Sequence, residues 1–289
     1  MKLLVLGAAG SLGRTLCGEA EARPGVSVAA ATHGDCDITD PTAVSELVGR
    51  VRPDTVVLTA AYTNVDRAEQ EPDTCFQVNV YGAENVARAA ARVGARLVAF
   101  STDFVFDGAK GAPYVEEDQV HPLSVYAASK AAMERALPAV CRDTLILRVG
   151  NLFGVHGRNF PARLPFLLAH GAPIRIDRDR TMAPTSTRAL ARQILALLQA
   201  PPPPGLYHAA CHGRATWADF ARLVADTLGL PLEAPMVPTE ELGLVAKRPR
   251  SSVLRNRRLA WLGLDVMPTW QEATLEFCEA VRPLLAAET

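Results

Sequence analysis

The regular alternation of short apolar runs with helical segments is the feature that most constrains the fold of this chain. Five runs are rich in Val, Leu and Ile, as strands buried on both faces are; they cover residues 2–7, 26–32, 54–61, 95–101 and 143–149. Between them, apolar residues recur every three or four positions and predict helices over residues 11–22, 41–51, 73–94 and 126–137. Strands that alternate with helices pair in parallel through right-handed crossovers. The first half therefore predicts an α/β fold with a doubly wound parallel sheet.

The pattern is looser after residue 150. Helices are expected near residues 159–170, 187–200, 216–229 and 268–286, with a short strand at 205–210. The run PPPP at 201–204 is a stiff break rather than a flexible domain linker. We expect residues 1–150 to form the sheet domain and residues 151–289 to form mainly a smaller α/β cap, from which the chain can cross back to the sheet.

Composition excludes several classes of protein. The formal net charge of −1 gives no reason to expect a nucleic acid or an anionic membrane as partner. The six cysteines are scattered without CxxC spacing, so neither zinc nor disulfides are expected. No stretch reaches the roughly 20 apolar residues that span a bilayer, and the apolar start runs directly into a glycine turn rather than a signal segment. We expect a soluble protein of the reducing cytoplasm.

The segment LGAAGSLGR, residues 6–14, has a G-x-x-G-x-x-G pattern between the first strand and the first helix. A plain strand-to-helix turn needs one glycine, whereas three in register allow the backbone to approach a pyrophosphate at the positive end of the helix. The pattern predicts a Rossmann-type NAD(P)-binding domain. The cofactor-binding candidates in this turn are Gly7, Gly10, Ser11, Leu12, Gly13 and Arg14.

The choice between NADH and NADPH depends on the end of the second strand. An acid about 20 residues after the glycines would bind the ribose 2′-OH of NAD, whereas a cation would accept the 2′-phosphate of NADP. Here the strand ends in Thr32 and His33, and Asp35 comes late. Arg14 could pair with a 2′-phosphate or cap the exposed side of its helix. The pattern slightly favours NADPH and leaves NADH open.

Three further residues predict the chemistry. Thr102 lies with Ser101 at the carboxyl end of the fourth strand, the edge at which open parallel sheets bind ligands. Tyr126 and Lys130 lie one helical turn apart, and a nearby ammonium group favours the phenolate form of a tyrosine. A YxxxK pair taken alone is usually the polar edge of a helix. Because it follows the glycine turn and Thr102 in the expected order, we predict Tyr126 as general acid, Lys130 as its electrostatic partner and Thr102 as the group that orients a carbonyl.

These features together resemble the extended short-chain dehydrogenase/reductases, and more narrowly the dTDP-4-dehydrorhamnose reductase family. The likeness extends over CDITD (36–40), TAAYTNVDRAEQEP (59–72), NVYGAENVA (79–87), STDFVFDG (101–108), PYVEEDQVHP (113–122), YAASK (126–130), RVGNLFGVHGRNF (148–160), APTSTRALA (183–191) and RPRSS (248–252). The resemblance implies reduction by NAD(P)H of the 4-keto group of a nucleotide-activated deoxysugar, expected to be dTDP-linked. It leaves a monomer or a homodimer open; some relatives use a metal-linked dimer, but no carboxylate cluster here indicates a metal.

The resemblance also assigns roles by position. It places Asp37 and Ile38 by the adenine, Ala60, Ala61 and Tyr62 by the pyrophosphate and ribose, and Asn79 near the far wall of the cofactor site, and it adds Ser101, Tyr126 and Lys130 to the cofactor-binding set. The substrate-binding candidates are Thr102, Asp103, Phe104, Asn151, Asn159 and Arg163. By charge, Arg163 and the basic cluster at 248–258 are candidate partners of the diphosphate, although each could equally be a solvated cation.

Two departures from the family pattern bear on specificity. The chain has Phe104 where the family usually has Tyr, and Asn151 where it usually has Trp, so the identity of the sugar stays open. A dehydratase would follow the Thr with Asp and Glu, and Phe104 stands in place of that Glu. Two alternatives to a reductase remain: an epimerase of the same superfamily, and a non-catalytic cofactor-binding regulatory subunit.

Overall fold

The centre of the protein is a six-stranded parallel sheet with strand order β10-β5-β4-β3-β1-β2, seen in a computed structural model that describes residues 1–288. The strands are β1 (Lys2–Leu6), β2 (Ser27–Ala31), β3 (Thr55–Leu58), β4 (Arg96–Thr102), β5 (Thr144–Val149) and β10 (Gly205–His208). Neighbouring residues of β1 point to opposite faces: Leu3 and Val5 join one core, and Leu4 and Leu6 join the other. A strand buried on both faces is therefore apolar throughout, as its sequence predicts.

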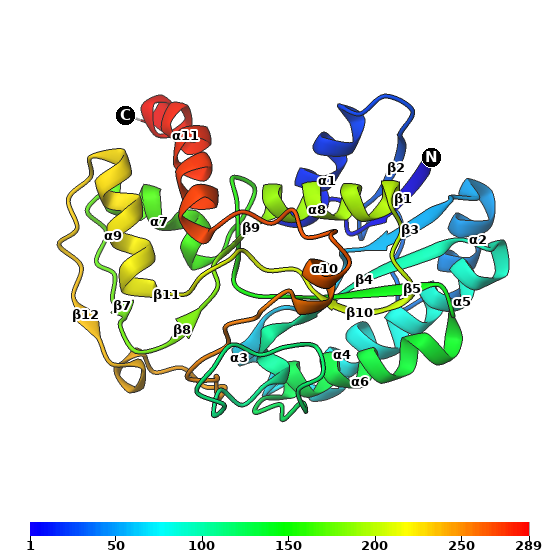
Figure 1. The fold of residues 1–289 in the computed structure, drawn as a ribbon, viewed down its shortest axis with the longest axis horizontal. Coiled ribbons are helices and arrows are strands. Elements are labelled where there is room, and N and C mark those ends of the chain that lie inside the picture. Colours follow the sequence, from blue (N-terminus) through cyan, green and yellow to red (C-terminus); the bar gives the residue numbers. More distant parts are fainter. Residues whose placement is uncertain (289) are drawn as a thin grey trace.

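Helices cover both faces of the sheet (Figure 1). α1 (Ser11–Glu21) packs beside α8 (Thr187–Gln199) on one face. α2 (Pro41–Val51), α5 (Ala83–Val93) and α6 (Val125–Val140) cover the other. The doubly wound α/β fold expected from the sequence is confirmed.

The helix expected over residues 73–94 is divided into three parts. It begins as α4 (Pro72–Phe76), widens into the π-helix η1 (Gln77–Gly82) and continues as α5, while a short α3 (Val65–Ala68) precedes it. Periodicity alone cannot detect such a turn, because π-helices carry no residue pattern of their own; they are frequent at functional sites. Here the widened turn contains Asn79, whose side chain contacts both the loop after β3 and helix α6.

The cap has its own apolar core between α7 (Phe160–Ala169), α9 (Trp217–Leu228) and α11 (Trp270–Glu288). Phe153 contacts Phe220 and Phe277 edge-on, with ring centroids 5.1 and 5.3 Å apart. Three two-stranded pairs complete the cap: β6 (Leu152–Phe153) with β9 (Thr185–Ser186), β7 (Ile176–Asp177) with β12 (Met236–Val237), and β8 (Thr181–Met182) with β11 (Ala215–Thr216). The short elements η2 (Asp103–Val105), η3 (Thr239–Leu242) and α10 (Arg257–Trp261) lie in the connecting segments.

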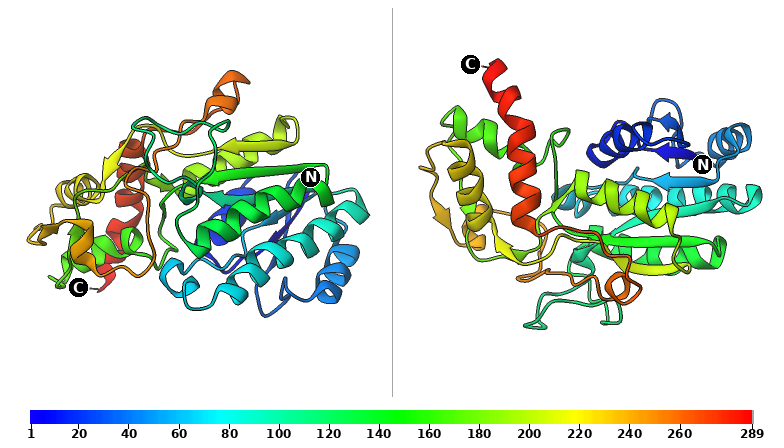
Figure 2. Two further views of the ribbon diagram at one scale, coloured as in Figure 1. Left: turned by 90° about the horizontal axis from the view of Figure 1, so that it is seen from below. Right: turned by 45° about the horizontal axis from the view of Figure 1, so that its top comes forward.

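The chain passes between the sheet and the cap several times. It enters the cap after β5, returns to the sheet through α8 and β10, and ends in the cap with α11 (Figures 1 and 2). The second half of the sequence therefore supplies the edge strand β10 and the face helix α8 as well as the cap. The cap stands beside the sheet in both views of Figure 2.

Residues 1–288 contain no membrane-spanning helix, no cluster of metal ligands and no disulfide. No helix in this part of the chain combines the length and apolar character needed to cross a membrane. No group of three or more His, Cys, Asp or Glu side chains within these residues is arranged to hold a metal ion. The six cysteines are all free thiols.

Candidate functional site

A cavity of about 1140 Å³ opens where the strands of the sheet end. The segments that follow β1, β2, β3, β4 and β5 all line it, and Asn159 at the start of α7 adds a residue from the cap. In a parallel sheet this edge gathers loops that are distant in sequence, which is why ligands bind there. The cavity includes the point where the strand order reverses, between β1 and β3.

The glycine turn forms one wall of this cavity and leaves no space for side chains. Gly7 has a φ of +88°, and a Cβ atom there would lie 2.4 Å from the backbone nitrogen of Ala60. A Cβ on Gly13 would lie 2.4 Å from the carbonyl oxygen of Gly7. Helix α1 begins at Ser11, with no side-chain cap and no acidic residue in its first turn. Its N-terminal N–H groups therefore suit an anionic group such as a pyrophosphate.

Two buried hydroxyl groups in the cavity wall lack protein partners. Ser11 Oγ and Ser101 Oγ are buried, and neither has a hydrogen-bond partner within the described residues. Leaving a buried polar group unpaired is costly, so such groups in a cavity indicate a missing ligand. Together with the glycine turn, these hydroxyls fit a dinucleotide cofactor. Asp37, Ile38, Ala60, Ala61 and Tyr62 line the same cavity.

Asn79 lies behind the cavity wall rather than in it. Its Oδ1 accepts a hydrogen bond from the backbone N–H of Tyr62 at 2.9 Å, and its Nδ2 donates to the Tyr62 carbonyl at 3.1 Å. The same Nδ2 donates to Ser129 Oγ on α6 at 2.9 Å. Asn79 therefore fastens the loop after β3 to the helix that carries Tyr126 and Lys130.

Thr102, Tyr126 and Lys130 all line the cavity. Helix α6 begins after Ser124, whose Oγ accepts from the N–H of Ala127, and this cap places Tyr126 in the first turn. Burial raises the pKa of Tyr126, which is hydrogen-bonded to the Thr102 side chain. Burial lowers the pKa of Lys130 to about 8. In this environment the phenol holds its proton, as a general acid must.

Asp103 is a buried carboxyl group beside Thr102. Its Oδ1 accepts from the Thr102 hydroxyl at 3.1 Å, and its Oδ2 accepts from Nδ2 of Asn151 at 3.1 Å. Burial raises the pKa of Asp103 to about 7. Gly150 allows this arrangement, since a Cβ there would lie 3.0 Å from the carboxyl carbon. Phe104 and Asn151 both line the cavity next to Asp103.

Several predicted residues lie outside this cavity. Arg14 lines a separate cavity of about 220 Å³, and Arg163 lines neither of the two. No residue of the basic cluster at 248–258 lines the main cavity. Arg248 instead pairs with Asp66 at 2.7 Å and, by that hydrogen bond, lowers the pKa of the Asp66 carboxyl to about 2.

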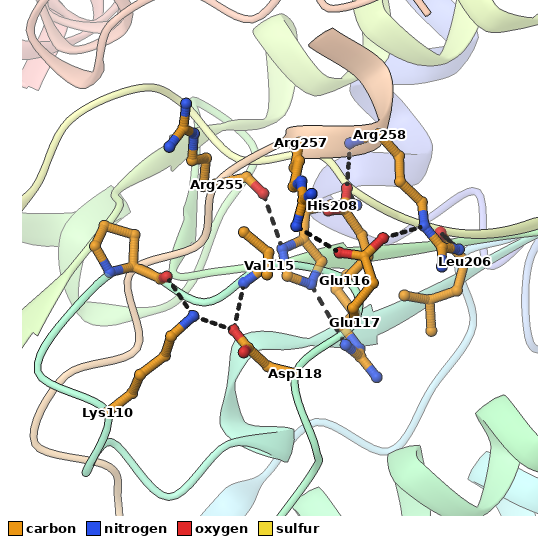
Figure 3. A network of polar contacts seen from close by, with 12 residues as sticks. Lys110, Val115, Glu116, Glu117, Asp118, Leu206, His208, Arg255, Arg257 and Arg258 are labelled. Atoms are coloured by element: carbon orange, nitrogen blue, oxygen red, sulfur yellow. Dashed lines mark hydrogen bonds and ion pairs between the residues drawn. The ribbon is translucent and has the colours of Figure 1, made fainter. Parts of the chain in front are cut away.

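The other end of the basic cluster is also engaged within the protein. Arg258 pairs with Glu117 at 3.0 Å, and its Nη1 donates to the Leu206 carbonyl at 2.9 Å (Figure 3). Its backbone N–H donates to Glu116 Oε1 at 3.2 Å. These contacts join the C-terminal segment to β10 and to the loop after β4.

Sequence reasoning missed part of the cavity lining. Thr63, Asp73 and Gln77 all contribute to it. Asp73 and Gln77 lie on α4 and on the π-helix, where no periodicity shows which side faces a ligand. Glu134 was also missed; it does not line the cavity, but it lies one helical turn after Lys130.

Comparisons with known proteins find the same family over nearly the whole chain. A family model described as "RmlD substrate binding domain" matches residues 1–282. The chain is 40% identical over 280 residues to the dTDP-4-dehydrorhamnose reductase of Streptomyces griseus, covering 94% of this chain and 91% of that protein.

Two solved structures are similar to this chain over nearly its whole length. The dTDP-4-dehydrorhamnose reductase of Clostridium acetobutylicum superposes with a TM-score of 0.93 at 34% identity, covering 98% of this chain and all of that one. The dTDP-4-dehydrorhamnose reductase of Bacillus anthracis, solved in complex with NADP, gives a TM-score of 0.91 at 32% identity over 96% of this chain and 99% of that one.

Proposed function

Because the chain belongs to the RmlD substrate binding domain family, we propose that it is an NAD(P)H-dependent reductase of a nucleotide-activated 4-keto-6-deoxysugar similar to dTDP-4-dehydrorhamnose. The relatives named above are reductases of that kind. One observation carries the proposal for this chain: Thr102, Tyr126 and Lys130 line the same cavity as the glycine turn. A cofactor held by the turn and a sugar held under the cap would meet at these three side chains.

A nicotinamide nucleotide bound in this cavity supplies the hydride that reduces the sugar carbonyl. The protein would hold it by the N-terminal N–H groups of α1 and by the hydroxyl groups of Ser11 and Ser101, which lack other partners within the described residues. Lys130, in the cavity wall, would contact the ribose next to the nicotinamide.

Tyr126 would act as the general acid. Its phenol holds a proton at Oη, because burial raises the pKa of this group. It would give that proton to the sugar oxygen as negative charge develops there, and Lys130 would stabilise the phenolate left behind. Thr102 would orient the carbonyl oxygen by a hydrogen bond once its hydroxyl proton, which is donated to Asp103 in this structure, turns to the substrate. Proton transfer by a positioned side chain contributes on the order of 10²- to 10⁴-fold to a rate.

We propose NADPH as the preferred cofactor. His33 lines the cavity just after β2, where an NAD-specific protein would present an acid. Asp35, the nearby acid, is already bound to Thr32: its Oδ2 accepts from the Thr32 N–H at 2.8 Å and from the Thr32 hydroxyl at 2.7 Å. The relative from Bacillus anthracis was solved with NADP.

We further propose that Phe104 and Asn151 select the sugar. Both line the cavity, Phe104 just after β4 and Asn151 just after β5. The amide of Asn151 donates to Asp103, so it leaves open the space that the ring of an aromatic side chain would fill. The expected substrate is a dTDP-linked 4-keto sugar, as the names of the relatives suggest.

The test is a panel of dTDP-, UDP- and GDP-linked 4-keto sugars, each supplied with NADPH or NADH. Loss of cofactor absorbance in step with sugar consumed, and a 4-hydroxy product by NMR, would support a reductase. An epimerase would retain its cofactor and give no net oxidation. Tyr126→Phe is the matched control. This variant should bind NADPH, as measured by nicotinamide fluorescence, but should not turn over the sugar. Oxidation of NAD(P)H by the wild type with no keto sugar present would contradict the proposal.

A further inference from the structure

A buried ion pair lies one helical turn beyond Lys130. Glu134 on α6 and Arg148 on β5 are joined by two hydrogen bonds, from Nε to Oε1 at 2.8 Å and from Nη2 to Oε2 at 2.7 Å. Their side chains are 7% and 4% exposed. Neither residue lines the cavity. Residues four apart on a helix lie on one face, so the Glu134 carboxylate is on the same side of α6 as Lys130 and acts on its charge without being part of the ligand site.

Arg148 is fixed in place by its other contacts. Its guanidinium lies over the ring of Phe106, 4.9 Å from the centroid, and its Nη1 is 3.4 Å from Nε2 of His208. His208 Nδ1 is 3.2 Å from the carbonyl oxygen of Arg255, and a carbonyl can only accept (Figure 3). Nδ1 therefore carries the proton, and Nε2 accepts from Arg148. Burial lowers the pKa of His208 to about 3, so the ring adds no charge to the pair.

Within residues 1–288, Glu134 is the carboxylate that acts on the charge of Lys130. The Lys130 side chain is buried, and its Nζ donates to Met133 Sδ at 3.6 Å. Two groups favour its charged form against burial: Glu134 on the same helix and the Cys75 thiol on α4. Burial raises the pKa of Cys75, so that thiol stays neutral. Besides burial, the charge of Asp103 raises the pKa of Tyr126 rather than acting on Lys130, and Tyr126 is an uncharged phenol.

We propose that Glu134, held by Arg148, is a positioning residue that keeps the Lys130 ammonium charged inside the cleft. A buried ion pair is seldom worth more to stability than apolar residues of similar size, so this pair calls for a role other than folding. The inference rests on the proposed function, because the charge of Lys130 matters to turnover only if Tyr126 is the acid.

The proton balance shows where this charge is needed. Tyr126 loses its phenol proton to the sugar oxygen, an O–H bond breaks at Tyr126 and another forms at the sugar, and a phenolate remains. Lys130 keeps its own proton and stabilises that phenolate until solvent returns a proton to it. A neutral Lys130 would leave the buried phenolate without the ammonium group as a counter-ion.

The charge of Lys130 can be measured directly, since the chain has only four lysines: Lys2, Lys110, Lys130 and Lys247. Protein labelled with ¹³C at the lysine Cε atoms would give four NMR signals to follow against pH, without substrate or cofactor. The Lys130 signal is identified by its loss in Lys130→Arg. In the wild type it should titrate near pH 8.

The two halves of the pair should act in opposite directions. Glu134→Gln leaves the Arg148 cation uncompensated and should move the Lys130 midpoint down by roughly one pH unit or more, whereas Arg148→Met leaves a bare carboxylate and should move it up. The double variant Glu134→Gln with Arg148→Met removes both charges of the pair, and its Lys130 midpoint should fall by less than that of Glu134→Gln alone. This variant keeps the test open if a single variant fails to fold.

A control pair lies at the far end of β5 from Arg148. Arg96, the first residue of β4, and Asp143, which directly precedes β5, are 2.7 Å apart, so Asp143→Asn should leave the Lys130 midpoint unchanged. Shifts of the same sign in both single variants, or an unchanged midpoint in the double variant, would overturn the proposal.

A second measurement links the charge to turnover. Where a keto sugar is reduced, the fall of kcat at high pH should begin at lower pH in Glu134→Gln than in the wild type, and Glu134→Asp should restore part of the difference. A purely structural role would lower kcat at every pH alike. If the NMR midpoints move as expected but no keto sugar is reduced by the wild type, the proposed function fails while the charge coupling stands.

Discussion

Asn151 donates a hydrogen bond from Nδ2 to Oδ2 of Asp103 at 3.1 Å, from a backbone with a φ of 46°. This left-handed conformation is tolerated by Asn better than by most residues. The other carboxyl oxygen of Asp103, Oδ1, accepts a hydrogen bond from the Thr102 hydroxyl at 3.1 Å. The residue at this corner therefore influences the position of the hydroxyl that would orient the substrate carbonyl, as well as the space for the sugar.

Replacing Asn151 should separate the two effects of this corner. Asn151→Ala and Asn151→Gly both remove the donor to Asp103, at a cost to the free energy of unfolding of about 1–3 kcal/mol. A φ of 46° strains alanine but not glycine, so the Asn151→Ala protein should be less stable than the Asn151→Gly protein by a further ~1 kcal/mol. Urea unfolding of both variants and the wild type measures the two differences. Equal stability of all three would show that neither the bond nor the strain matters.

The buried Asp103 should make stability depend on pH with an unusual sign. Its pKa is raised by burial from 3.8 to about 7, so between these values the folded protein binds more protons than the unfolded chain. The contribution of Asp103 to stability therefore falls as pH rises from about 4 to about 7, by up to roughly 4 kcal/mol in total, and is flat above that range.

Asp103→Asn is the matched variant, since an amide does not titrate in this range. Urea midpoints measured across the range should fall more steeply with pH in the wild type than in the variant. Parallel pH profiles for the two proteins would contradict the raised pKa.

The glycine turn should be intolerant of any side chain. Gly7→Ala places a Cβ where the backbone of Ala60 already lies, at a φ of +88°, and should cost roughly 1–3 kcal/mol of stability along with most cofactor affinity. Gly49→Ala is the control, because Gly49 lies within α2 with no atom within 4 Å of the added Cβ. That change should stabilise the protein by about 0.5–1 kcal/mol. Thermal unfolding and NADPH fluorescence report the two effects.

The sheet could be predicted closely from the sequence because buried parallel strands are continuously apolar. The first strand was expected at residues 2–7 and runs over Lys2–Leu6, and the fourth was expected at 95–101 and runs over Arg96–Thr102. The π-helix at Gln77–Gly82 was missed, since a one-residue widening of a helix depends on tertiary contacts such as those of Asn79. Local periodicity carries no information on such contacts.

Several predicted residues line the cavity because their place along the chain has a physical meaning. Gly7 lies in a glycine turn before a helix, Thr102 at the carboxyl end of a strand, and Tyr126 follows both in the expected order. The basic cluster at 248–258 was a candidate by charge alone, and no member lines the cavity. Charge does not tell whether an arginine faces a ligand or a carboxylate, and Arg248 faces Asp66. Glu134 and Arg148 meet only because α6 packs on β5.

Cofactor preference should depend on the residue after β2. His33→Asp places a carboxylate in the cavity wall, where it would accept a hydrogen bond from a ribose 2′-OH and repel a 2′-phosphate. The ratio of kcat/KM for NADPH to that for NADH should fall by roughly tenfold or more, which corresponds to about 1.4 kcal/mol. Asp35→Asn is the control, because Asp35 is exposed and bound to Thr32, and that variant should keep the wild-type ratio. If Asp35→Asn instead weakens the use of NADH, then Asp35 and not position 33 contacts the ribose, and the preference for NADPH has a different origin.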